Sequence, residues 1–177
     1  YSQDWNRELS PPLAAFREWT ERYRAPSDRA VRDALEQEGL MLAQSRRTEM
    51  LAVIKTDPQR ALAITVPAVV RQSLPASVLD ELESRIAGVG DFATSIEARR
   101  SLAANAVSRI SRSAFIGGTT YEAHVDGRRR SKPTKEKTPL HGIVLDGQLA
   151  LHESPMRVVE PGEALAAPDS QVCPVWD

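Results

Sequence analysis

The sequence predicts an α+β fold in which a helical N-terminal half, with one long helix and several short ones, precedes a small, mostly antiparallel β-sheet. Two observations support this. Apolar residues recur at helical spacing through the first half of the chain, whereas beyond Gly88 strand-like runs alternate with turn signals. We therefore expect a helical subdomain at residues 1–90, a β subdomain packed on it at residues 91–160, and an extended tail or linker at residues 161–177.

The first two helices are expected to be one short and one long. A pair of prolines opens residues 13–23, where proline is tolerated because the N–H that it lacks has no partner in a first helical turn. Ser27 and Asp28 are expected to cap a second helix over residues 29–55. Gly39 is the weak point of this long helix, since glycine is a poor helix former.

Three short helices are expected to follow. Each begins near a proline, which can occupy the first position of a helix. Helices this short are marginal in water by themselves, so they must pack on the long helix. The prolines are Pro58, Pro67 and Pro75, and the apolar stretches that follow them are residues 60–64, 68–74 and 76–86.

The second half has the composition of strands. The Gly88-Val-Gly-Asp91 stretch breaks the helical pattern, and two Asp-Gly pairs, at 126–127 and 146–147, are signals for type I′ turns. The second pair predicts a β-hairpin with Leu145 opposite Gln148. The expected strands are residues 113–116, 118–125 and 143–151.

A basic stretch lies between the two turn signals. Residues 128–138 hold three Arg, three Lys and one Glu. We expect a solvated loop; the alternatives are a processing site for a trypsin-like protease and a phosphate-binding patch. No aromatic residue interrupts the stretch, which argues against base stacking.

Composition narrows the classes of partner and activity. The 23 Lys and Arg balance 24 Asp and Glu, and no apolar run approaches the ~18 residues of a membrane span, so neither a nucleic-acid nor a membrane partner is expected. The chain lacks the His-Glu-x-x-His, Gly-x-Ser-x-Gly and P-loop motifs. We expect a chain that is not an enzyme by itself and holds no cofactor. Because it begins with Tyr1, we also expect a processed or cut segment.

Two histidines form a candidate metal site. If Asp146-Gly147 makes a two-residue turn, His141 and His152 face each other with their imidazoles on one side of the hairpin. Such a pair could bind a transition metal. The alternative is a structural pair at the open end of the hairpin.

The single cysteine, Cys173, lies in the proline-marked C-terminal stretch. It could be incidental, form an intermolecular disulfide, or bind a metal in another domain as a thiolate. A thiolate in the open position of a catalytic zinc displaces the water that would become the nucleophile. Joined to a folded domain, such a peptide would be an effective tethered inhibitor.

The end of the chain resembles the cysteine switch that closes the pro-segment of matrix-type and reprolysin-like zinc metalloproteases, Pro-Arg-Cys-Gly-Val-Pro-Asp. Cys173, Val175 and Asp177 match that pattern at the same offsets. Val172 stands where the family has Arg, so the ion pair of the family's switch is missing, and Pro174 and Trp176 replace its Gly and Pro.

A longer part of the chain resembles the N-terminal, pro-domain-like region of large secreted bacterial proteins, some of which are similar to reprolysin-like metalloproteases further along. The similar stretches are residues 35–91, with KTDPQRALAITVPAVVRQSLP and GVGDF, and the later PLHGIVLDGQLALHESPMRVVEPGE.

These resemblances imply a non-catalytic pro-domain or accessory domain, secreted, at the cell surface or in the periplasm. Its partner would be the catalytic domain of the same precursor, or another protein domain. Cys173 would bind the partner's catalytic zinc in trans, with Trp176 and Asp177 contacting the partner. The alternative is a binding or structural module of a large secreted or cell-surface bacterial protein.

Overall fold

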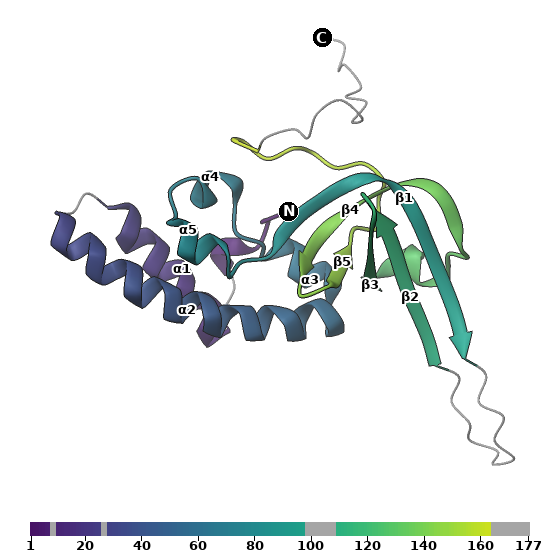
Figure 1. The fold of residues 1–177 in the computed structure, drawn as a ribbon, viewed down its shortest axis with the longest axis horizontal. Helices are drawn as coiled ribbons and strands as arrows, with labels where there is room; N and C mark the ends of the chain where they lie inside the picture. The colour runs from purple at the N-terminus through teal and green to yellow at the C-terminus, as the bar shows by residue number, and fades with distance from the viewer. Residues whose placement is uncertain (8–9, 26–27, 98–108, 164–177) are drawn as a thin grey trace, which may run out of the picture.

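The computed structural model describes residues 1–7, 10–25, 28–97 and 109–163, which form a helical layer beside a β-barrel (Figure 1). This confirms the predicted α+β class. The helices are α1 (Pro11–Arg24), α2 (Arg29–Thr56), α3 (Pro58–Ala63), α4 (Ala68–Arg71) and α5 (Ala76–Leu79), with 3₁₀ turns η1 (Trp5–Arg7) and η2 (Gly127–Ser131). The strands are β1 (Ser84–Glu97), β2 (Arg109–Ile116), β3 (Thr119–Val125), β4 (Lys135–Leu145) and β5 (Gln148–Leu151).

The α1–α2 pair confirms the first two predicted helices. Asp28 caps α2 by accepting a hydrogen bond from the amide of Val31, whereas Ser27 lies outside the described residues. The expected weak point at Gly39 does not interrupt α2. The indole of Trp19 packs so closely on this glycine that a Cβ there would lie 2.1 Å from a ring carbon. Gly39 therefore makes room for α1.

Three short helices follow, as predicted, but the third ends earlier than expected. α5 stops at Leu79, and the chain is already in β1 at Ser84. The glycines expected to separate helix from sheet lie inside this strand. At Gly90 a Cβ would lie 2.2 Å from the carbonyl oxygen of Phe115, so glycine permits close approach of β2 where the pairing with β4 shifts register.

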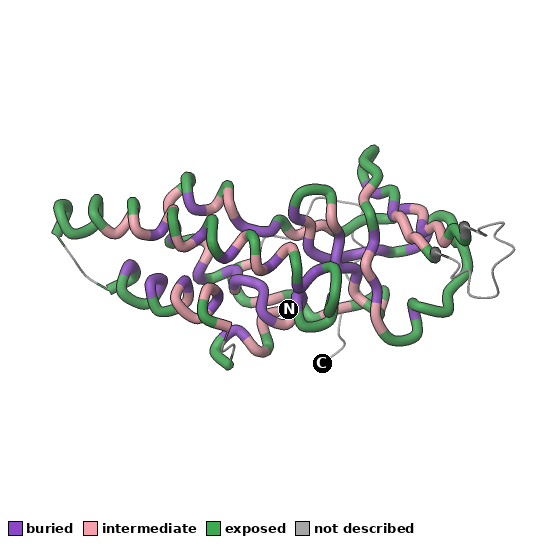
Figure 2. The backbone as a smooth tube through the Cα atoms, turned by 90° about the horizontal axis from the view of Figure 1, so that it is seen from below, coloured by how far each residue is buried: buried purple, intermediate pink, exposed green. Residues whose placement is uncertain are grey.

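The strands close into a barrel in the order β1-β2-β3-β5-β4. All neighbouring pairs are antiparallel except β3 and β5, so the sheet is mostly antiparallel, as predicted. Apolar side chains fill the interior; the fully buried ones include Phe92, Leu140 and Leu149. The helical layer has a core of its own, and a third cluster joins α1, α2 and α3 to β4 and β5. Figure 2 shows buried segments where the helices meet the barrel.

The two Asp-Gly signals differ in outcome. Asp146 and Gly147 have φ of 48° and 73° and connect β4 to β5 with Leu145 opposite Gln148, which confirms the hairpin. The turn predicted at 126–127 is wrong. Asp126 is extended, with φ −124°, and the chain enters η2 rather than a hairpin because β3 pairs with β2 and β5.

The basic stretch that follows is only partly a solvated loop. Arg129 is buried, and its Nε donates to the carbonyl of His152 over 2.6 Å. Lys135 already belongs to β4, whose first residues the sequence prediction missed. Packing of Arg129 against the end of β5 explains why the segment is ordered as η2.

Candidate functional site

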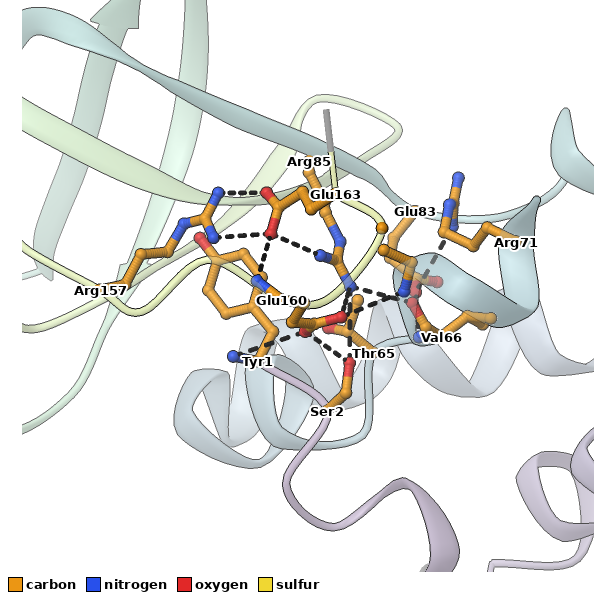
Figure 3. Close-up of polar contacts among 12 residues, drawn as sticks. Tyr1, Ser2, Thr65, Val66, Arg71, Glu83, Arg85, Arg157, Glu160 and Glu163 are labelled. Atoms are coloured by element: carbon orange, nitrogen blue, oxygen red, sulfur yellow. Dashed lines mark hydrogen bonds and ion pairs between the residues drawn. The ribbon is translucent and has the colours of Figure 1, made fainter. Parts of the chain in front are cut away.

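A group of partly buried charges fastens the chain that follows β5 to the start of β1 (Figure 3). We name Arg85, Arg157, Glu160 and Glu163 the carboxylate clasp. Arg85 donates to Glu160 over 2.8 Å and lies 3.1 Å from Glu163. Both terminal nitrogens of Arg157 donate to Glu163. The clasp thus joins residues that are 75 positions apart in the sequence.

Further hydrogen bonds extend the clasp to the helical layer. Glu160 accepts from the hydroxyl of Ser2 over 2.8 Å and from the amide of Ala68 over 3.1 Å. Gln72 donates to the carbonyl of Gly162 over 2.6 Å. The stretch from residue 161 onward was expected to be an extended tail; its first residues, 161–163, instead continue a turn that Glu160 binds to β1 and α4.

The clasp carboxylates are stabilised in their charged form. Burial favours the neutral acid, but hydrogen bonds from Arg85, Ala68 and Ser2 outweigh it and lower the pKa of Glu160. For Glu163, burial is likewise outweighed by the hydrogen bond from Arg157, so that its pKa also falls below the ordinary value. The clasp is therefore an ionic structure near neutral pH.

His141 and His152 face each other, as the hairpin register predicted. The amide of His152 donates to the carbonyl of His141 over 2.9 Å, and the two rings stack with centroids 4.7 Å apart. The hydroxyl of Tyr1 lies 2.9 Å from Nδ1 of His141. Burial, together with neighbouring His152 and Arg157, lowers the pKa of His141 to about 4. The pKa of His152 is lowered too, chiefly by burial.

Metal binding by this pair remains a prediction. Within the described ranges no group of three or more His, Cys, Asp or Glu side chains is placed to hold a metal ion. Nδ1 of His141 is engaged by Tyr1, and Nδ1 of His152 accepts from the amide of Ser154 over 3.1 Å. A metal would therefore have to use the Nε2 atoms. His124 lies apart, 2.7 Å from Gln148.

The residues of the predicted cysteine switch, which are Cys173, Trp176 and Asp177, lie outside the described residues. The clasp ends at residue 163, and the three residues follow it in the sequence.

β1 and β2 extend beyond the barrel as a two-stranded ribbon (Figure 1). Ile96 and Ile110 are directly opposite each other, and they are 66% and 51% exposed. The β1–β4 register ends at the pair of Phe92 with Lys135, and beyond it β1 pairs only with β2. The sequence prediction missed the ribbon because it interprets residues 88–91 as a break in the helical pattern and assigns no strand before residue 113.

The buried ion pair between Arg46 of α2 and Glu83 was also not predicted from the sequence. Glu83 was expected in a helix but lies just before β1, and both side chains are fully buried. The two residues are 37 positions apart, a distance at which spacing carries no signal.

No protein-family model matches the chain, and neither a curated protein nor a solved structure shows a significant match to it. Among the helices that the structure describes, none has both the length and the apolar character to cross a bilayer.

Proposed function

We propose that this chain is a non-catalytic accessory domain of a larger secreted bacterial protein, and that it presents its own C-terminal segment to a neighbouring domain. The carboxylate clasp is the observation that supports this proposal. It holds residues 157–163 against β1 and α4, and so sets the point from which residues 164–177 continue.

The clasp is better suited to positioning the C-terminal segment than to stabilising the fold. Partly removing four charges from water costs free energy that ion pairing recovers only in part, so such pairs contribute little net stability. They do restrict position. A segment that leaves a fixed point reaches a neighbouring surface at a higher effective concentration than a free chain would.

In its specific form, the proposal is a pro-domain that keeps a zinc metalloprotease latent. Cys173 would bind the catalytic zinc of the partner domain as a thiolate, in the position that water needs. Trp176 would add apolar contact, and Asp177 a polar one, at the cleft. The matches to the cysteine-switch pattern support this form.

The test is inhibition of the catalytic domain of the same precursor by the wild-type chain, by Cys173→Ser and by Glu160→Gln/Glu163→Gln. We expect strong inhibition by the wild type, loss with Cys173→Ser, and weaker inhibition by the clasp variant. Glu136→Gln, at an exposed position of β4, is the matched control and should inhibit like the wild type. Equal inhibition by Cys173→Ser would exclude the switch, and equal inhibition by the clasp variant would exclude presentation.

The second candidate is a binding module that docks through the β1–β2 ribbon. An isolated two-stranded ribbon is marginally stable in water, and a facing pair of exposed isoleucines is suited to contact with an apolar surface of a neighbouring domain. Ile96→Thr/Ile110→Thr keeps the β-branched shape and should abolish such binding. Val89→Thr, an exposed site near the barrel, is the control. Unchanged binding by the ribbon variant would rule this candidate out.

A further inference from the structure

A pocket of about 290 Å³ lies where β2 and β3 separate. The β2–β3 pairing ends at Ser113 opposite Glu122. Beyond that point β2 continues only with β1, and β3 only with β5. The end of α2 and the first residue of α3 cover the split. The pocket is lined by Lys55, Thr56, Pro58, Ile110, Ser111, Arg112, Glu122, Ala123, His124, Val125 and Arg130.

The charges around this pocket are mostly positive. Its lining holds three cations, Lys55, Arg112 and Arg130, but one carboxylate, Glu122. That carboxylate already accepts a hydrogen bond from the amide of Gln148 over 3.1 Å. The whole chain has a formal net charge of −1, so the positive charge is a local property of this pocket.

Two of the cations are held in place by the backbone. Arg112 donates a hydrogen bond through Nη2 to the carbonyl of Arg130 over 2.7 Å. Its Nη1 takes no part in this bond. Arg130 donates to the carbonyl of Val125 and pairs with Asp126, which lies outside the lining, at 2.9 Å. Three cations against the two carboxylates of Glu122 and Asp126 leave an excess of one positive charge at the pocket.

We propose that this pocket binds the phosphoryl group of a small phosphorylated molecule. A guanidinium matches a tetrahedral oxyanion in geometry, and a lysine ammonium supplies a second charge. Ser111 and His124 are polar residues that line the same pocket. The volume is at the small end of the range for ligand sites, which suits a single phosphate with a compact organic part.

Another pocket of the described region differs in charge. It has about 330 Å³ and lies beside Tyr1 and His152, with Asp4 and Asp57 against Arg60. This pocket is similar in size to the one between β2 and β3 but lacks its excess of positive charge. It therefore serves as a comparison within the same molecule. No clasp residue lines the phosphoryl site, so this inference stands apart from the proposed function.

The test is a titration of the labelled chain with inorganic phosphate and, separately, with glucose 6-phosphate, followed by amide NMR shifts. We expect saturable shifts at Ser111, Arg112 and His124. Arg112→Gln should weaken binding at least about tenfold, because it removes a charged hydrogen bond. Arg128→Gln, which removes an exposed charge outside the lining, should change affinity by less than about twofold.

Weaker binding by Arg112→Gln would also result from a folding defect, so Lys55→Gln is the second pocket variant. Lys55 is exposed at the end of α2, where the substitution should not disturb the fold. It should weaken binding severalfold without lowering the thermal midpoint. Tighter binding of glucose 6-phosphate would identify an organic phosphate, and tighter binding of inorganic phosphate a free one. The inference is overturned if neither probe shifts these amides at about 10 mM, or if Arg128→Gln weakens binding as much as the two pocket variants.

Discussion

Arg46 and Glu83 form an ion pair in which Nη1 and Oε2 are 2.5 Å apart and neither side chain is exposed. Glu83 also accepts a hydrogen bond from the amide of Val66 over 3.0 Å. Burial by itself would raise the pKa of Glu83, but the nearby Arg46 outweighs it and lowers that pKa. The pair therefore links α2, the segment before α4 and the beginning of β1.

Glu83→Gln should destabilise the protein by about 3–5 kcal/mol, because it leaves the charge of Arg46 buried without its partner. The double variant Arg46→Met/Glu83→Leu should recover most of this loss, since it removes both charges together. Urea unfolding at pH 7 measures the free energies. Glu81→Gln, which alters the partly exposed pair with Arg47, is the control and should cost less than about 1 kcal/mol. A similarly small loss in Glu83→Gln would contradict the expectation.

Gly39→Ala should destabilise the protein although alanine is the better helix former. The propensity gain is about 1 kcal/mol, but the new Cβ would overlap the buried ring of Trp19. Overpacking of this kind costs about 1–3 kcal/mol. Ser45→Ala, at an exposed position of α2, should instead be neutral or slightly stabilising. Thermal unfolding of both variants tests this expectation. A higher midpoint for Gly39→Ala than for the wild type would contradict it and show that α1 can shift.

Features that depend on neighbouring residues could be predicted from the sequence. The cap at Asp28, the long helix and the turn at Asp146-Gly147 each rest on a few consecutive side chains. The facing of His141 and His152 followed from that turn by counting residues.

Features that depend on distant residues could not. The glycines of β1 break a helical pattern, yet in the barrel they allow β2 to approach, and no local signal separates the two cases. Closure of β1 on β4 and the contact of Arg85 with Glu160 join segments that only the complete fold brings together.

Acid should release the clasp. The pKa of both Glu160 and Glu163 is lower in the folded protein than the ordinary 4.5. Their contribution is therefore complete above about 4.5 and is lost as the pH falls through the lower, folded-state values. Amide NMR shifts of residues 157–163 should move toward random-coil values in this window, before the barrel unfolds. Glu160→Gln should show the same shifts at pH 7. Unchanged shifts in both experiments would mean that other contacts hold the segment.

His141 should make the protein less stable in mild acid. Its folded-state pKa of about 4 lies below the ordinary 6.5, so between these values the unfolded chain binds the proton and the folded chain does not. Stability from this group is thus complete above 6.5 and falls as the pH drops toward 4, with the lowered pKa of His152 acting in the same direction. Between pH 7 and 5 we expect a loss of about 2 kcal/mol, which urea unfolding at each pH measures. The clasp stays ionised over this range, so the two effects are separable. His141→Gln/His152→Gln should remove most of the dependence. An unchanged slope in this variant would assign the acid sensitivity to other groups.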